Sequence, residues 1–330
     1  MATGAAAPGA REGDGMGNAI AVEGLAKRFG NREALRGIDF EIERGSVFGV
    51  IGPNGAGKTT AMRCLLDIIR PTAGTVRVLG TDPRRAGPEV RRRIGYLPGE
   101  LALERRITGR RMMSHFAAIS GPVRPGRVDG LAARLGLELD RQSRKLSKGN
   151  KQKLGLVQAF MHDPELLILD EPTSGLDPLM QREFLAMVEE AKGRGQTVFL
   201  SSHMIGEIQQ AADTVAILRD GLIVRTATVA ELRAGARRRL RVVAAAGPDA
   251  LAAHLDRLPG LERSGVVRLE EGASVLDAAY AGDVGALLHA LSGLDVRDLV
   301  LEEPDLEEAV LELYGSGPGN GRLRAEGERR

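Results

Sequence analysis

The amino-acid sequence predicts an α/β fold with a mainly parallel sheet. Between residues 20 and about 224, short apolar runs alternate with longer helical patterns, and several runs end in glycine or polar residues. This alternation is typical of parallel strands joined by helices. The clearest runs are four to six residues long, at 46–51, 166–169, 197–200 and 214–218. We expect these runs to be strands that are buried on both faces.

A small antiparallel sheet is predicted beside the parallel one. Ile38, Phe40 and Ile42 alternate with acidic residues, which is the period-two pattern of a strand with one wet face. Asp220 and Gly221 lie between two apolar runs, and an Asp-Gly pair in that setting favours a β-hairpin.

A helical subdomain is predicted at about residues 100–160. Between residues 101 and 158 the strand pattern disappears, and helical periodicity is interrupted only by a Gly/Pro cluster at 121–126. We therefore expect a helical insertion within an α/β domain that covers residues 19–228.

The composition shifts after about residue 228. An arginine-rich stretch comes first (Arg233, Arg237, Arg238, Arg239 and Arg241), and mixed strand and helix patterns follow as far as Tyr314. We expect a small α+β domain at 229–315, with the arginines on a solvated linker; contact with anionic lipid headgroups is the alternative. The tails at 1–18 and 316–330 have too few apolar residues to pack, so we expect them to be disordered.

Composition excludes several classes of function. The 330 residues include 46 Lys and Arg against 44 Asp and Glu, a net charge of +2, and only 3% aromatic residues. Neither global charge nor base stacking therefore favours a nucleic-acid partner. One cysteine, Cys64, excludes an internal disulfide and suits a reducing compartment. No run approaches the roughly 20 apolar residues that span a bilayer, and we expect a cytoplasmic chain without a secretory signal.

The strongest motif is a phosphate-binding loop directly after the run at 46–51. It consists of Gly52, Pro53, Asn54, Gly55, Ala56, Gly57, Lys58, Thr59 and Thr60. Its glycines allow backbone N–H groups to point at phosphate oxygens, and the helix that begins near Lys58 adds its positive end. We expect Lys58 to reach the β and γ phosphates and the Thr59 hydroxyl to bind Mg²⁺.

Two acids, Asp170 and Glu171, follow the run at 166–169. The carboxyl end of a parallel strand is where such sheets bind ligands. We expect Asp170 to hold Mg²⁺ and Glu171 to deprotonate the water that attacks a γ-phosphate; a strand that simply ends in two solvated acids is the alternative. His203 follows another run, at 197–202, where it could donate a hydrogen bond to that phosphate, although a lone histidine is more often structural.

These motifs resemble the ATPase subunits of ATP-binding cassette (ABC) transporters. The resemblance spans residues 20 to about 224 and rests on GPNGAGKTT, SSHM and the tract LSKGNKQKLGLVQAFMHDPELLILDEPTSGLDPLMQ at 146–181. It implies ATP and Mg²⁺ as cofactors, a second protomer and a membrane permease. It also implies roles for three further groups: a signature (Ser147, Lys148, Gly149 and Asn150) that faces the other protomer's ATP, a D-loop (Ser174 and Asp177), and His203 as the switch histidine. Without the resemblance, the signature predicts only a turn and a helix cap.

The sequence departs from the family pattern in places. Family members usually carry a glutamine after a strand such as 94–98, but here Gly99 and Glu100 follow. Glu100 either substitutes for that Q-loop glutamine or the contact is lost. The signature also has Lys148 and Asn150 where glycine and glutamine are commonest. Phe29 matches the aromatic residue that stacks on adenine, with a core position in the antiparallel sheet as the alternative.

Residues 282–314 resemble the extra C-terminal domain of a drug-export branch of these ATPases, and their acids alternate with apolar residues as in an amphipathic packing segment. The resemblance therefore implies an ATP-hydrolysing exporter subunit, a homodimer on the inner face of the cell membrane beneath a separately encoded permease. One alternative is a switch that acts on ribosomes or DNA, but no second cassette or coiled coil is present. The other is a soluble nucleotide-dependent scaffold or resistance switch without transport.

Overall fold

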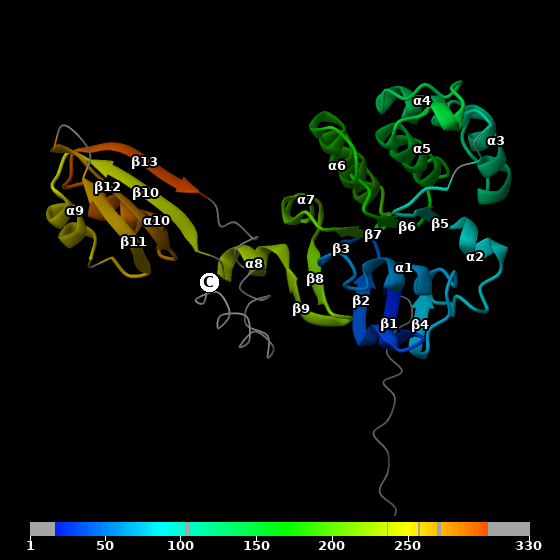
Figure 1. Ribbon diagram of the computed structural model, residues 1–330, viewed down its shortest axis with the longest axis horizontal. Helices are drawn as coiled ribbons and strands as arrows, with labels where there is room; N and C mark the ends of the chain where they lie inside the picture. Colours follow the sequence, from blue (N-terminus) through cyan, green and yellow to red (C-terminus); the bar gives the residue numbers. More distant parts are fainter. Residues whose placement is uncertain are drawn as a thin grey trace, which may run out of the picture. The chain divides into compact units, whose positions relative to one another are not determined.

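The computed structural model describes residues 17–102, 104, 106–235, 237–256, 258–268 and 272–302. The chain divides into two compact units between Thr226 and Ala227 (Figure 1). Of the tails predicted to be disordered, residues 1–16 and 316–330 lie outside the described residues, as does most of the acidic segment before Tyr314. Asn18 already begins strand β1 (Asn18–Phe29).

The first unit contains a six-stranded sheet in the order β5-β6-β7-β3-β8-β9. Neighbouring strands from β5 to β8 are parallel, which confirms the predicted α/β class. The strands are β3 (Val47–Ile51), β5 (Ile94–Leu97), β6 (Leu166–Asp170), β7 (Thr197–Ser202), β8 (Thr214–Arg219) and β9 (Leu222–Thr228). Asp220 and Gly221 join β8 to β9, both with positive φ, 48° and 76°, as in a type I′ turn. The predicted hairpin is confirmed.

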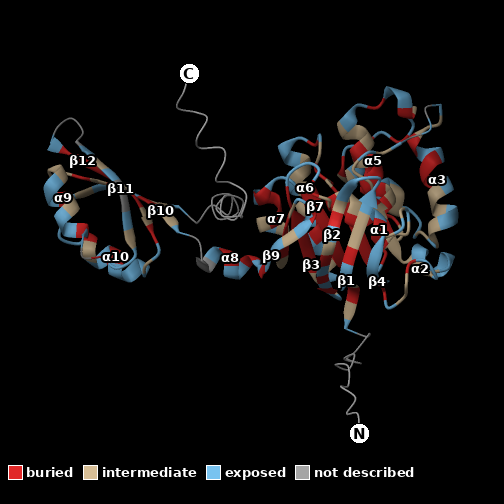
Figure 2. Cartoon of the chain, turned by 60° about the horizontal axis from the view of Figure 1, so that its bottom comes forward, coloured by how far each residue is buried: buried red, intermediate tan, exposed pale blue. Residues whose placement is uncertain are grey.

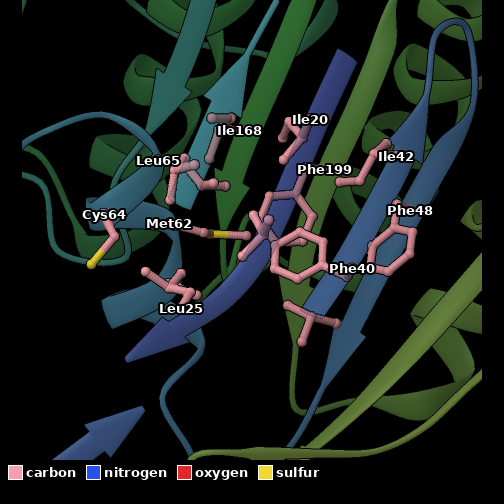
Figure 3. Close-up of a cluster of buried hydrophobic side chains, with 14 of the residues drawn as sticks. Ile20, Leu25, Phe40, Ile42, Phe48, Met62, Cys64, Leu65, Ile168 and Phe199 are labelled. Atoms are coloured by element: carbon pink, nitrogen blue, oxygen red, sulfur yellow. The ribbon is translucent and has the colours of Figure 1, made fainter. Parts of the chain in front are cut away.

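The predicted antiparallel sheet is also present, in the order β2-β1-β4, with β2 at Arg32–Glu43 and β4 at Ala73–Val78. Its apolar face packs on the parallel sheet and on helix α1 (Lys58–Leu65). Phe40 of β2 lies 5.7 Å, between ring centroids, from both Phe48 and Phe199 (Figure 3). Aromatic pairs of this kind contribute about 0.5–1.5 kcal/mol beyond area burial, so they fix β2 against the strands that precede the phosphate loop and His203.

The helical subdomain consists of α3 (Gly109–Ser120), α4 (Arg127–Arg134), a 3₁₀ turn (Ser143–Lys145) and α5 (Lys148–Phe160). The predicted break at 121–126 separates α3 from α4. Helix α5 packs closely on β5, because a Cβ atom on Gly95 would lie only 2.2 Å from the Ala159 carbonyl oxygen. The other helices of the first unit are α2 (Pro88–Arg92), α6 (Pro178–Gly193) and α7 (Ile205–Ala211). Buried residues gather in the strands and on the inner helix faces (Figure 2).

The second unit is a four-stranded antiparallel sheet with two helices. After α8 (Val229–Gly235), its elements are β10 (Arg238–Ala244), α9 (Pro248–Leu255), β11 (Leu261–Arg268), β12 (Ser274–Tyr280), α10 (Val284–Leu291) and β13 (Val296–Glu302). The strand order β11-β12-β10-β13 and the βαββαβ chain order are those of a ferredoxin-like fold. Tyr280 and Leu240 of the sheet share its core with Leu251 and Leu287 of the helices.

The prediction of a linker is wrong for Arg238, Arg239 and Arg241, although Arg239 and Arg241 are exposed as expected. Arg238, Arg239 and Arg241 belong to β10, which pairs with β12 on one side and β13 on the other. Leu240 and Val242 are fully buried on either side of the exposed Arg241, so the segment has the period-two pattern of a half-buried strand. The density of arginine obscured this alternation. Within the described residues, no helix is both long and apolar enough to cross a membrane.

Candidate active site

The phosphate loop lies between β3 and α1, in close contact with β8. A Cβ atom on Gly52 would lie 2.3 Å from the Leu218 carbonyl oxygen, so only glycine fits where the loop crosses β8. Gly57, with φ of 116°, precedes α1, and no side chain caps that helix end. The first N–H groups of α1 are therefore available to an anion.

Lys58 is buried within this loop, with a side chain only 6% exposed. Its Nζ donates a hydrogen bond to the Gly52 carbonyl oxygen at 2.6 Å. The same Nζ lies 3.2 Å from Oε1 of Glu171, an ion pair without hydrogen-bond geometry. The loop and the end of β6 are thus joined through one ammonium group.

Glu171 is held in a constrained position. Its φ is 49°, a left-handed conformation that side-chain-bearing residues adopt at a cost of about 1–3 kcal/mol and that gathers at functional sites. Its Oε2 lies 2.6 Å from Nδ1 of His203. The carboxylate can only accept, so Nδ1 carries the proton and Nε2 remains available to a ligand. The structure therefore brings Lys58, Glu171 and His203 together.

Asp170 is fully buried at the end of β6. The hydroxyl of Ser201 donates a hydrogen bond to its Oδ1 at 2.7 Å, while its Oδ2 has no hydrogen-bond partner among the described residues. With Glu171 only 19% exposed, the alternative of two solvated acids is wrong. Burial, followed by the negative charge of Asp170, raises the pKa of Tyr96 on the neighbouring β5 above its usual value.

The free oxygen of Asp170 fits a magnesium site. A buried carboxylate oxygen and the Thr59 hydroxyl are the hard ligands that Mg²⁺ prefers, and such sites usually complete themselves with waters and substrate phosphates. Accordingly, the described residues hold no cluster of three or more His, Cys, Asp or Glu side chains that could bind a metal alone. Gly99 lies against this oxygen, because a Cβ atom there would be 3.1 Å from Oδ2.

A pocket of about 400 Å³, here called the loop pocket, opens over the phosphate loop. Its lining residues are Phe29, Arg32, Ala34, Pro53, Asn54, Gly55, Ala56, Gly57, Lys58, Thr59, Thr60 and Glu171. Phe29 is 49% exposed, so the alternative of a core position is wrong. Lys27 covers one face of its ring, with Nζ 4.8 Å from the centroid, which leaves the other face for a planar ligand.

The signature residues do not line the loop pocket. Ser147 caps α5 by accepting a hydrogen bond from the Asn150 N–H at 3.2 Å, as a helix cap should. A Cβ atom on Gly149 would lie 2.6 Å from the Gly175 carbonyl oxygen, and Lys148 packs along Gly175. The signature and the D-loop are therefore in direct contact within one chain.

The D-loop residues are local caps, and Glu100 lies elsewhere. Asp177 caps α6 by accepting from the Met180 N–H at 3.0 Å, and the Ser174 N–H donates to the Glu171 carbonyl oxygen at 3.1 Å. Glu100 is exposed at a second, mainly apolar pocket with Tyr96 and Phe116, formed partly by α3. The structure does not place Glu100 in the loop pocket.

Sequence reasoning missed two supporting residues. Gln152 of α5 is 4% exposed, and its Nε2 donates to the carbonyl oxygens of Glu171 and Pro172, both at 3.0 Å. Ser201 pairs with Asp170 across β6 and β7 and also accepts from the Glu171 N–H at 3.0 Å. Two serines at the end of the apolar run at 198–200 were the only available signal for Ser201.

We predict that Ser201→Ala weakens both stability and any hydrolysis at this site. The change leaves a buried carboxylate oxygen of Asp170 and the Glu171 N–H without their shared partner, which should lower the free energy of unfolding by about 1–3 kcal/mol. Turnover should fall about tenfold because Glu171 loses a constraint on its backbone. Denaturant unfolding and phosphate release measure the two effects. Ser201→Thr, which keeps the hydroxyl, serves as the control; equal losses in both variants would contradict this role.

Comparisons with known proteins identify relatives of this chain. Residues 35–174 match the family model described as "ABC transporter". The chain is 38% identical over 306 residues to "Daunorubicin resistance ATP-binding protein DrrA3" of Streptomyces coeruleorubidus, covering 90% of this chain and 96% of that protein. It is 31% identical over 311 residues to "Bacitracin transport ATP-binding protein BcrA" of Bacillus licheniformis, covering 92% and 99%.

Solved structures of ATP-binding cassettes resemble this chain in fold. "Structure of ATP binding subunit of ABC transporter" matches with a TM-score of 0.60 and 28% identity, over 65% of this chain and 91% of that one. The cassette MJ0796, in a dimeric "post-hydrolysis state" with ADP and Pi, matches with a TM-score of 0.58 over 64% and 98%. At 20% identity, this second likeness concerns the fold alone.

Proposed function

Because the chain belongs to the ATP-binding proteins of ABC transporters, we propose that it binds and hydrolyses ATP to drive an exporter. One observation carries the catalytic part of the proposal. Lys58, Glu171 and His203 come from three separate segments and are joined by a 3.2 Å ion pair and a 2.6 Å hydrogen bond that share the Glu171 carboxylate. Of the three, Lys58 and Glu171 line the loop pocket. A shared, partly buried carboxylate of this kind suits a general base.

The proposed chemistry assigns one task to each group. The N–H groups of the loop and Lys58 bind the phosphates, and Phe29 stacks on the adenine. Asp170 and Thr59 would hold Mg²⁺, which when bound would neutralise charge on the phosphate oxygens. Glu171 takes a proton from water as that water attacks the γ-phosphorus and the bond to ADP breaks. His203 keeps the Glu171 carboxylate in place through Nδ1–H, and it donates a hydrogen bond to the γ-phosphate when Nε2 also carries a proton.

The position of the signature supports a dimeric active form. Ser147 and Gly149 lie at the N-terminus of the 13-residue helix α5, outside the loop pocket of their own chain. A helix N-terminus of this kind suits an anion, and in a dimer it would meet the ATP held by the partner's phosphate loop. We propose that two copies close over two ATP molecules, and that the Gln152 contact with the Glu171 backbone joins hydrolysis to movement of α5.

The cargo class is inferred from the relatives. DrrA3 is named for daunorubicin resistance and BcrA for bacitracin transport, so we propose that this chain energises export of a drug-like molecule. The membrane path would be supplied by a separately encoded permease, with the ATPase on the inner face of the membrane.

The test is recovery of a membrane partner. We predict that tagged Glu171→Gln protein, incubated with Mg-ATP and detergent-solubilised native membranes, retains a protein with several membrane spans. The reason is that a variant that binds ATP without hydrolysing it stays in the ATP-bound state, which we expect to bind the permease.

Lys58→Ala protein, treated identically, is the control and should retain much less of this partner. Recovery of soluble proteins only, from a Glu171→Gln sample that demonstrably binds ATP, would contradict the exporter proposal. It would favour a nucleotide-dependent scaffold instead.

A further inference from the structure

Arg32 lies in the wall of the loop pocket, although it belongs to none of the motifs above. Phe29 ends β1, Arg32 begins β2, and the two residues are paired directly across the turn of the hairpin. Directly opposed residues of an antiparallel pair project from the same face of the sheet. The Arg32 side chain is therefore placed beside the ring of Phe29, on the side of the hairpin that faces the pocket.

The guanidinium of Arg32 reaches the phosphate loop. A Cβ atom built on Gly55 would lie 3.4 Å from Nη2 of Arg32, which is a near-contact distance. Arg32 therefore spans from the ring proposed to bind adenine to the loop proposed to bind phosphate. A ligand that occupied both of these places would pass within reach of the guanidinium.

Arg32 is also the uncompensated charge of the loop pocket. Its neighbours in the hairpin are both paired with Glu33, Arg28 at 2.7 Å and Arg36 at 3.8 Å. Arg32 makes no ion pair or hydrogen bond with any residue that the structure describes. The other charged residues that line the pocket, Lys58 and Glu171, are paired with each other. Among the described residues that line the loop pocket, Arg32 is thus a positively charged side chain without an ion-pair partner.

We propose that the Arg32 guanidinium binds the phosphate chain of the nucleotide. A planar fork of N–H donors matches two oxygens of a phosphate group and keeps its charge at every physiological pH. The contact would make Arg32 a specificity residue that favours nucleoside polyphosphates. This inference rests on the proposed ATP binding, since it assigns a further contact to the same site.

Another pocket, which is mainly polar, also borders Arg32, but it suits an anion less well than the loop pocket does. That pocket is lined by Glu33 and Asp220 in addition to Arg28, Arg36 and Arg32. Both carboxylates repel a phosphate, and Glu33 already engages Arg28 and Arg36. Among the described residues that line the loop pocket, Glu171 alone carries a carboxylate, and Lys58 neutralises it, so a phosphate chain draws Arg32 toward the loop.

The experiment measures binding of two probes to the full chain. A fluorescent ATP analogue is titrated onto wild type, Arg32→Ala, Arg32→Lys and a control, and inorganic tripolyphosphate is used to displace it. Arg77→Ala is the matched control, because Arg77 is an exposed arginine on β4 of the same sheet and lines neither pocket. Each variant is checked for an unchanged melting temperature.

We expect Arg32→Ala to raise the Kd for ATP and for tripolyphosphate alike, by roughly tenfold to a hundredfold, as for loss of a charged hydrogen bond. Arg32→Lys should recover part of the loss, and Arg77→Ala should stay within about twofold of wild type.

Three results would overturn the inference. They also show whether Arg32 alone is wrongly assigned or whether the proposed ATP binding fails as well. Unchanged binding by Arg32→Ala, with wild type binding ATP and Lys58→Ala failing to bind, would leave the ATPase proposal intact and remove Arg32. Weaker ATP binding with unchanged tripolyphosphate binding would mean that Arg32 acts through the adenine side of the pocket. If wild type binds neither probe, the proposed function fails first.

Discussion

Glu171→Gln is expected to bind ATP while hydrolysing it about 10²–10⁴-fold more slowly than wild type, the range for loss of a general base. An amide keeps the shape of the side chain and can still contact His203, but it cannot accept a proton from water. It also removes a negative charge 3.2 Å from Lys58, which frees that ammonium for the phosphates. ATP binding should therefore be as tight as in wild type or tighter.

The same variant should reveal the closed dimer. With Mg-ATP, gel filtration is expected to show a species of twice the monomer mass, because trapped ATP holds the two copies together. Glu89→Gln is the matched control, since Glu89 is an exposed acid on α2 outside the loop pocket; it should hydrolyse ATP as wild type does and remain monomeric after turnover. A Glu171→Gln protein that binds ATP but stays monomeric would argue against closure over two nucleotides.

The parts of this site that could be predicted from the sequence are those formed by residues that are neighbours in the sequence. The phosphate loop is continuous in sequence, and its glycines, lysine and hydroxyl have a fixed spacing that few other structures need. Asp170 and Glu171 follow an apolar strand, and a parallel sheet gathers strand ends at one edge. Local spacing and sheet geometry together were enough to place these groups.

The parts that could not be predicted depend on register between distant segments. Ser201 reaches Asp170 only because β6 and β7 pair Asp170 with Ser201. Arg32 becomes a pocket residue only because a two-residue turn sets it opposite Phe29. The pairing of Ser201 with Asp170 has no sequence signature, since its register follows from the packing of whole strands. Gly30 and Asn31 do favour a two-residue hairpin turn, but that signal does not show that the turn borders the phosphate loop.

The second unit shows a different limit of prediction from sequence. Arginine in strand β10 hid the alternation of Leu240 and Val242, so composition suggested a linker where the chain forms an inner strand of a sheet. Exposed positions of a half-buried strand tolerate arginine well, because its long stem covers apolar surface while the charge stays in water. A high density of charge therefore does not exclude a strand when every second residue is apolar.

Lys58→Ala is expected to raise the Kd for ATP by at least about a hundredfold. The side chain is 6% exposed, so its charge acts in a poorly screened site, where charge-assisted hydrogen bonds contribute most. The loss has two parts: the direct contact with phosphate disappears, and the partly buried Glu171 carboxylate loses its ion pair with Lys58 and repels the phosphates. The second part predicts a specific coupling between the two positions.

A double-mutant cycle measures that coupling. If repulsion by Glu171 contributes, Lys58→Ala combined with Glu171→Gln should bind the fluorescent ATP analogue several-fold more tightly than Lys58→Ala alone. Lys192→Ala is the control, because Lys192 forms a comparable ion pair with Asp213, at 2.6 Å, outside the loop pocket. It should lose some stability and no ATP affinity. Unchanged ATP binding by Lys58→Ala would show that the loop does not bind phosphate through this lysine, whereas strictly additive effects would mean that Glu171 and Lys58 act on ATP independently despite their contact.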